Sequence, residues 1–197
     1  MTKQFYSIKE EVRVVGFDDG PFKRGDTHVL VVGCVFRGGV FMDGVVSTTV
    51  EVDGLDSTDK LCELLLNLRF KDVRVVMLDG IAFGGFNVVD IKRLHEESGY
   101  PVIVVTRDMP DFDEIKNALK HTDDPSIRLK MMEDAGKPHF VKTKGEKGVY
   151  IQFVGLEKKD AEGIVSVCAT RSLLPEAIRC AHLIGQGLAL GQSRGSP

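Results

Sequence analysis

The chain has 197 residues, of which 43% are hydrophobic and 28% are charged, and its formal net charge is −3. This size and apolar content suit a single domain with a full core, which we predict over residues 1–197. The acidic balance excludes a protein that bulk positive charge holds on nucleic acid, so a polyanionic partner would need a local basic patch or a bound cation. No apolar run reaches the length of about 18 residues that a membrane span requires.

The first residues and the cysteines favour a cytoplasmic protein. The opening sequence MTKQFYSIKEEVR carries acids early and lacks the apolar stretch of a secretory signal. No two cysteines have CxxC spacing, and each lies among apolar neighbours, which favours buried thiols in a reducing compartment over a zinc site or disulfides. These cysteines are Cys34, Cys62, Cys168 and Cys180.

Three closely spaced β-rich runs come first in the chain. Val12–Phe17 predicts a strand that is closed by a turn at the sequence DDGP. Val29–Phe36 and Val40–Val52 flank the sequence RGG, which is typical of an antiparallel hairpin. The spacing leaves no room for helices between these strands, so we predict an antiparallel meander.

Helices and strands then alternate. Ser57 and Thr58 are predicted to cap a helix that runs through the sequence KLCELLLNLRF, with leucines on one face. Val73–Leu78 is a near-continuous apolar run, as a central parallel strand requires. A helix over residues 86–99 and a second buried strand, Pro101–Val105, are predicted to follow.

The C-terminal half adds a hairpin and further helices. The hairpin is predicted over residues 139–155 with its turn near Gly145, and helices are predicted over residues 112–120, 125–135, 157–169 and 175–190. This order predicts an α/β fold with a ribonuclease H-like mixed sheet: three antiparallel strands precede parallel strands, helices flank the sheet, and the C-terminal hairpin is an addition. It fits a Rossmann fold less well, because there the first strand leads through a GxGxxG turn into a helix.

Acidic residues follow two of the predicted strands. Asp18 and Asp19 end the first strand, and Asp79 ends the fourth. If these strands are parallel neighbours, their carboxyl ends meet at one edge of the sheet, so Asp79 and one of the two earlier aspartates lie side by side. Close carboxylates repel each other unless a proton or a cation lies between them, and Mg²⁺ or Mn²⁺ suits such oxygen ligands. The open alternative is that these acids only form turns.

Two further residues are candidates for the same site. His182 lies in an apolar helical sequence, where a packed, hydrogen-bonded histidine competes with a ligand or an acid/base group. Asp56 follows the third strand and would complete a metal site, with Asp53 and the strand residue Glu51 as alternatives. A turn and a helix N-cap are the competing interpretation of this segment.

The glycine-rich loop DGIAFGGFN offers a third kind of contact. Its glycines allow close backbone approach, and Phe83 and Phe86 would either stack on a base or belong to the core. The basic candidates are scattered along the chain, and each is as compatible with a solvated surface as with a function. They are Lys23, Arg24, Arg107, Arg171 and Arg179.

Four motifs together resemble a mainly archaeal protein family that is distantly related to endonuclease V. They are VVGFDDGPF, VDGLDST, MLDGIAFGGFNVVDI and LPEAIRCAHLI, and the resemblance spans roughly residues 12–194. Endonuclease V cuts DNA or RNA near deaminated purines with a divalent metal on a ribonuclease H-like fold. The resemblance implies that Asp18, Asp79 and His182 correspond to its two aspartates and its histidine.

The sequence also departs from endonuclease V. The catalytic glutamate of that family, in a Phe-Arg-Glu context, has no clear match, and two alternatives are open: either Asp53 or Asp56 replaces it, or this ligand is missing. The tyrosine-containing wedge motif that opens the lesion site is absent from the sequence.

These observations lead to one main functional hypothesis and two rivals. The first is a divalent-metal-dependent, nuclease-like protein that acts on DNA or RNA phosphodiesters, with Mg²⁺ or Mn²⁺ as its cofactor. Its catalytic residues would be Asp18, Asp79 and His182, and its metal ligands Asp18, Asp19, Asp56 and Asp79. The rivals are a non-catalytic nucleic-acid or nucleotide binding protein with a degenerate site, and a scaffold protein whose strand-end acids are only turns.

Overall fold

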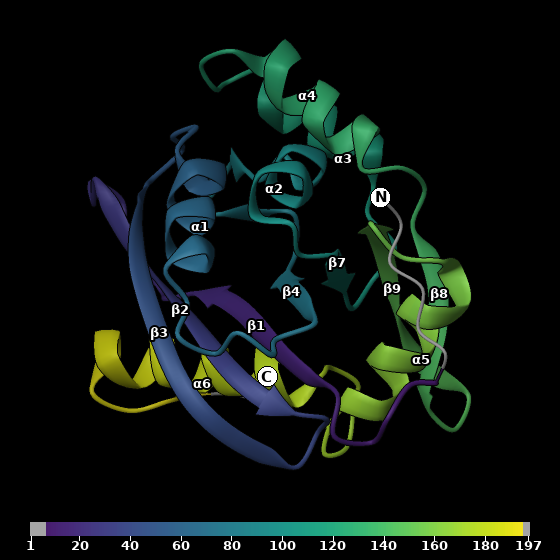
Figure 1. The fold of residues 1–197 in the computed structure, drawn as a ribbon. Helices are drawn as coiled ribbons and strands as arrows, with labels where there is room; N and C mark the ends of the chain where they lie inside the picture. The colour runs from purple at the N-terminus through teal and green to yellow at the C-terminus, as the bar shows by residue number, and fades with distance from the viewer. Residues whose placement is uncertain (1–6, 195–197) are drawn as a thin grey trace.

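The computed structural model of the chain describes residues 7–194, which form a mixed sheet between two layers of helices (Figure 1). The sheet has seven strands in the order β3-β2-β1-β4-β7-β9-β8. Its two faces bury separate apolar clusters, so the core consists of two halves with the sheet between them.

The first three strands form the predicted meander. They are β1 (Arg13–Asp19), β2 (His28–Arg37) and β3 (Phe41–Glu51), and each pairs antiparallel with the next. The tight turn between β2 and β3 contains Gly38, whose positive φ of 53° favours glycine.

Parallel strands continue the sheet from the other side of β1. Here β4 (Val75–Asp79) pairs parallel with β1, and β7 (Val102–Thr106) pairs parallel with β4, so these are the parallel strands that were predicted to follow the meander. The register aligns Phe17 with Leu78, so the acids that follow these two residues end neighbouring strands.

The predicted C-terminal hairpin extends the sheet beyond β7. It consists of β8 (His139–Lys144) and β9 (Lys147–Val154), and β9 runs antiparallel to β7. Thr106 pairs with Tyr150, which puts the turn of the hairpin at the same edge of the sheet as the end of β7.

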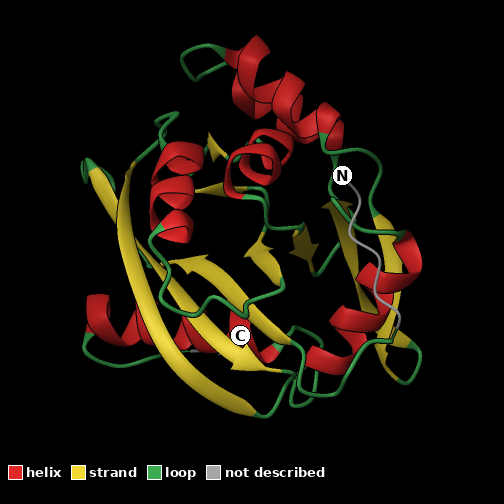
Figure 2. Ribbon diagram, in the orientation of Figure 1, coloured by secondary structure: helices red, strands yellow, loops and turns green. Residues whose placement is uncertain are grey.

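Helices cover both faces of the sheet (Figure 2). On one face lie α1 (Ser57–Leu66) and α2 (Ile91–Ser98), and on the other lie α5 (Lys158–Cys168) and α6 (Glu176–Leu190). The outer helices α3 (Phe112–Leu119) and α4 (Pro125–Asp134) share a small third cluster. Among the described residues, no helix combines the length and apolarity needed to cross a membrane.

The predicted cap of α1 was wrong. Asp56 occupies the N-cap position and makes no side-chain capping bond, while Ser57 and Thr58 are buried inside the first turn. The hydroxyl of Thr58 instead accepts the backbone N–H of Asp90 at 3.0 Å, so it ties α1 to the start of α2.

The helix predicted over residues 86–99 is shorter than expected. Its first residues form a small ribbon of β5 (Ala82–Phe83) and β6 (Asn87–Val88), because Gly84 and Gly85 reverse the chain with positive φ angles. The helix starts only after Asp90, whose carboxylate accepts two backbone N–H groups of the first turn. Its predicted end at Gly99 is confirmed.

Glycines let α6 lie directly on the strands that carry the aspartates. A Cβ atom on Gly16 of β1 would stand 2.6 Å from the backbone nitrogen of Ile178, and one on Gly185 would stand 3.3 Å from the Cα of Gly20. No side chain separates helix and strand at these points. This close approach brings the middle of α6, with His182, over the end of β1.

Candidate metal centre

Three residues from distant parts of the chain meet at the carboxyl ends of β1 and β4. Asp18, Asp79 and His182 each present one ligand atom, and these atoms all lie within 4.8 Å of one another. They line a pocket of about 380 Å³ whose wall also includes Phe22 and Gln186. The structure thus brings together three of the residues that the sequence singled out.

The imidazole of His182 is held from both sides. Its Nδ1 lies 2.7 Å from Oδ2 of Asp18, and its Nε2 lies 2.9 Å from the side-chain amide nitrogen of Gln186. Because that amide nitrogen can only donate, Nε2 accepts and the ring proton belongs on Nδ1, pointing at Asp18. A glutamine four residues further along α6 therefore orients the histidine.

The two adjacent aspartates point in different directions. Asp18 faces His182 and is buried, with 5% of its surface exposed. Asp19 also lines the pocket, but its Oδ2 accepts the backbone N–H of Gly84 at 2.7 Å. Asp18 is therefore the member of the pair that groups with Asp79, and Asp19 fastens the glycine-rich loop to β1.

Burial and crowding shift the acidity of the whole group. Burial, reinforced by the charges of Asp79 and Asp19, raises the pKa of Asp18 to about 9. Burial also raises the pKa of Asp79 to about 6, although the charge of Arg107 opposes this shift. The pKa of His182 is lowered by burial and by Arg107. All three shifts favour the uncharged forms.

Arg107 is the basic residue that belongs to this region. It follows β7 directly, and its charge acts on Asp18, Asp79 and His182. The sequence offered it only as one of several scattered cations. Its position after a strand parallel to β4 was the signal that could have distinguished it.

The structure does not bring Asp56 to the other predicted ligands. Its Oδ1 accepts the side-chain amide of Asn87 at 2.6 Å and the backbone N–H of Glu51 at 3.0 Å. Asp53 has a positive φ of 54°, and its carboxylate accepts the N–H of Phe86 at 2.8 Å. Both acids stabilise the loop between β3 and α1, and neither lines the pocket with Asp18.

Arg128 of α4 was missed by the sequence analysis. Its side chain is 2% exposed and donates to the carbonyls of Asp53 at 2.7 Å, Gly54 at 2.6 Å and Phe86. A buried arginine bonded to backbone carbonyls carries no sequence signal, because its partners depend on the fold. Arg128 therefore ties the loop at Asp53 and Gly54 to the loop at Phe86. The second of these loops also contains Gly84, whose backbone N–H donates to Asp19.

The fold and the site together define a class: an α/β protein with carboxylates and a histidine at the carboxyl ends of neighbouring parallel strands. Residues 10–189 match the family model described as Endonuclease dU, and the chain therefore belongs to this family. It is 50% identical over 195 residues to the UPF0215 protein of Methanothermobacter thermautotrophicus, covering 98% of this chain and 95% of that protein. A UPF0215 protein of Methanosarcina acetivorans is 45% identical over 192 residues, covering 96% of this chain and 97% of that protein.

Solved structures confirm the fold. A protein of unknown function from Archaeoglobus fulgidus superimposes with a TM-score of 0.81 at 36% identity, covering 89% of this chain and 97% of that one. Endonuclease V of Ciona intestinalis, in complex with an inosine-containing DNA, gives a TM-score of 0.55 at 18% identity, covering 86% and 82%. Human endonuclease V superimposes with a TM-score of 0.54 at 17% identity, covering 86% of this chain and 80% of that one. The predicted ribonuclease H-like fold is confirmed, and endonuclease V shares it.

Proposed function

We propose that this protein is a divalent-metal-dependent nuclease that hydrolyses phosphodiesters of nucleic acid at the Asp18–Asp79–His182 group. The observation that supports this most directly is the convergence of three ligand atoms within 4.8 Å at the ends of β1 and β4. The family description, Endonuclease dU, supports the same reaction class.

The residues present fit a hard divalent cation. Two carboxylates and an imidazole nitrogen suit Mg²⁺ or Mn²⁺, and two buried acids with raised pKa values need a positive charge to ionise together. Asp18 and Asp79 would hold the cation, with His182 as a third ligand or as a proton-transfer group. When bound, the metal supplies Lewis-acid activation of the phosphodiester toward attack by water.

Neighbouring side chains define what the protein itself contributes. The side-chain amide nitrogen of Gln186 donates to Nε2 of His182, while its Oε1 accepts the backbone N–H of Arg194, so the glutamine is held in place and fixes the ring plane. Arg107 places a positive charge beside the carboxylates, where it favours their ionised forms and attracts an anionic substrate. Asp19 keeps the loop at Gly84 in place through the 2.7 Å bond described above.

The substrate we propose is nucleic acid with a deaminated base. The family description names dU, and the Ciona endonuclease V structure holds a DNA with an inosine. A specific observation favours a second candidate, a protein that binds such nucleic acid without cutting it. Asp56 is engaged with Asn87, so the group lacks the fourth side-chain ligand that the sequence analysis expected.

Cleavage of labelled oligonucleotides separates the two candidates. Duplex and single-stranded DNA with one dU, one inosine or no lesion, and RNA with one inosine, would be incubated with Mn²⁺, Mg²⁺ or EDTA. We expect metal-dependent cleavage by the wild type and by Asp123→Asn, whose exposed carboxylate is remote from the site, and loss of cleavage in Asp79→Asn. Tight metal-dependent binding with no product from any substrate would support the non-catalytic protein and overturn the nuclease.

A further inference from the structure

A second hollow of about 530 Å³ lies beside the metal centre. Its lining consists of Arg107, Lys144, Lys147 and the segment Ser172–Leu174, so within the described part of the chain it contains three cations and no acid. We call it the basic hollow. Such a concentration of positive charge is unexpected on a chain with a net charge of −3.

The two lysines of the basic hollow are not used within the protein. They flank the turn of the β8–β9 hairpin, where Lys142 pairs with Glu146 at 2.6 Å. Lys144 and Lys147 are exposed and have no ion-pair or hydrogen-bond partner through their side chains among residues 7–194. Their charges are therefore available to an external anion.

Arg107 connects the basic hollow to the metal centre. Its charge acts on Asp18 and Asp79, and its side chain also lines the basic hollow. The pairing of Thr106 with Tyr150 puts the hairpin turn at the edge of the sheet where β7 ends. The two lysines therefore lie at the same edge of the sheet as the metal centre.

We infer that the basic hollow binds phosphate groups of the nucleic-acid strand next to the phosphodiester at the metal centre. Lys144 and Lys147 meet the phosphates, Arg107 lies between them and the cleavage site, and the partly exposed Leu173 provides an apolar contact for a sugar. The ligand is the sugar–phosphate backbone, which DNA and RNA share. This inference rests on the proposed function, because it assigns a path to the substrate of that reaction.

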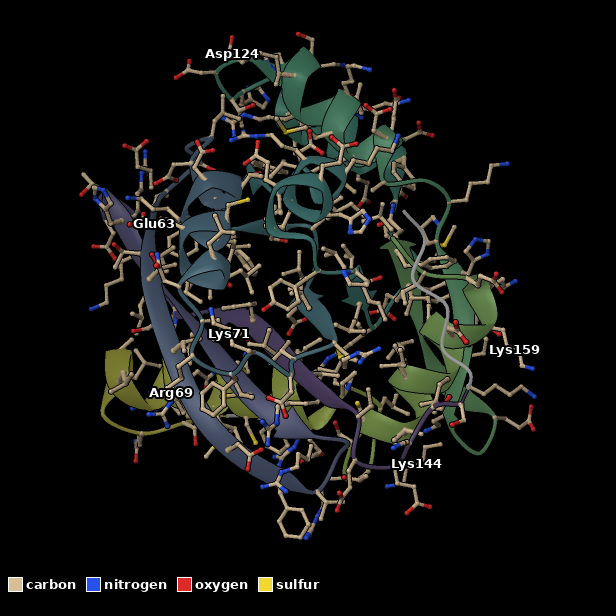
Figure 3. The ribbon with its side chains drawn as sticks, viewed as in Figure 1. Glu63, Arg69, Lys71, Asp124, Lys144 and Lys159 are labelled. Carbon is tan, nitrogen blue, oxygen red and sulfur yellow. The ribbon has the colours of Figure 1, made fainter. Side chains whose placement is uncertain are left out.

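The test compares two double variants that remove equal charge. Lys144→Ala/Lys147→Ala removes two of the three positive charges that line the basic hollow. Lys137→Ala/Lys159→Ala is the control, because Lys137 precedes β8 and Lys159 lies in the first turn of α5, which follows β9, so neither lies at the turn of the hairpin. Figure 3 labels Lys144 and Lys159. All four lysines are exposed, and equal melting temperatures of the two variants would verify their folding.

Binding would be measured by fluorescence anisotropy with labelled single-stranded DNA and RNA 20-mers in EDTA, at several salt concentrations. Two lost phosphate contacts should weaken binding by about tenfold or more near 0.1 M salt and lower the salt slope by about 1.4. The control should stay within about twofold of wild type, and Lys144→Arg/Lys147→Arg should restore binding. Dependence on the lysines with only one of the two polymers would identify the backbone that the basic hollow accepts.

Equal weakening in both double variants would overturn the inference, because it would indicate bulk charge and no defined path. Absence of binding by the wild type would overturn it as well. The nuclease proposal is tested separately, by metal-dependent cleavage and its loss in Asp79→Asn. A wild type that cleaves while Lys144→Ala/Lys147→Ala binds normally would therefore refute only the basic hollow.

Discussion

Asp79→Asn should be more stable than wild type when no metal is present, and less stable than wild type when a divalent metal is bound. Without metal, the variant removes a carboxylate whose pKa burial raises from 3.8 to about 6. At about 1.4 kcal/mol per pKa unit, ionising this group in the folded protein costs up to about 3 kcal/mol above pH 6. Asp79 keeps some contact with water, so we expect a gain of about 1–2 kcal/mol in Asp79→Asn.

The direction of the pH dependence follows from the same shifts. Folded-state pKa values above the unfolded ones mean that the folded protein binds protons more tightly, so the contribution of these groups to stability falls as pH rises. For Asp79 the fall lies between about pH 4 and 6, and for Asp18 it continues to about 9. The advantage of Asp79→Asn should therefore be absent at pH 4 and full at pH 8.

Thermal melts at pH 4 and pH 8, in EDTA and in millimolar Mn²⁺, would measure these effects. At pH 8 in EDTA the variant should melt roughly 2–8 °C above wild type, since 1 kcal/mol is worth about 2–4 °C in a domain of this size. Mn²⁺ at 100 times its Kd should stabilise wild type by about 2.7 kcal/mol and the variant much less. Asp123→Asn, at an exposed loop position, should follow wild type in every condition. A variant that is less stable than wild type at pH 8 in EDTA, or that gains equally from Mn²⁺, would refute the reasoning.

Three further substitutions test the surroundings of the site. Gln186→Leu removes the hydrogen-bond partner of Nε2 of His182, so the affinity for Mn²⁺, measured by calorimetry, should fall about 10–100-fold. An unchanged affinity would contradict the role of Gln186 in orienting the imidazole. Arg128→Met leaves several backbone carbonyls without a donor, so urea unfolding should show a loss on the order of 2–4 kcal/mol; a loss below about 1 kcal/mol would argue against the clamp. Gly16→Ala should destabilise by about 1–3 kcal/mol, because its Cβ would meet the backbone of α6 at 2.6 Å. Gly187→Ala, with open space around it in the same helix, should be neutral or stabilising, and similar effects of both alanines would disprove the close approach.

The sequence predicted the parts of the site that depend on strand order. The approach of Asp18 or Asp19 to Asp79 was expected on the condition that the first and fourth strands are parallel neighbours, and the structure pairs these strands in that way. His182 was harder, because its approach to Asp18 requires α6 to lie on β1 through glycine contacts that no local pattern reveals. The single-domain organisation and the cytoplasmic location stay predictions.

The misses have a common physical cause, which is competition among polar groups for partners. Ser57 and Thr58 have the side chains of helix caps, but burial inside α1 gave the hydroxyl of Thr58 a different partner, Asp90. Asp56 has the side chain of a metal ligand, but its carboxylate accepts the side-chain amide of Asn87. Which partner wins depends on contacts between segments about 30 residues apart, and propensity does not include them.

Asp18 and His182 are separated by 164 positions, and this distance has a consequence during protein synthesis. Both aspartates leave the ribosome long before the histidine, so a nascent or prematurely terminated chain lacks α6 and leaves one face of β1 uncovered. The carboxylates of such a chain face solvent without the imidazole and without the low-dielectric wall that raises their pKa values. The complete Asp18–Asp79–His182 group therefore forms only when α6 docks on β1.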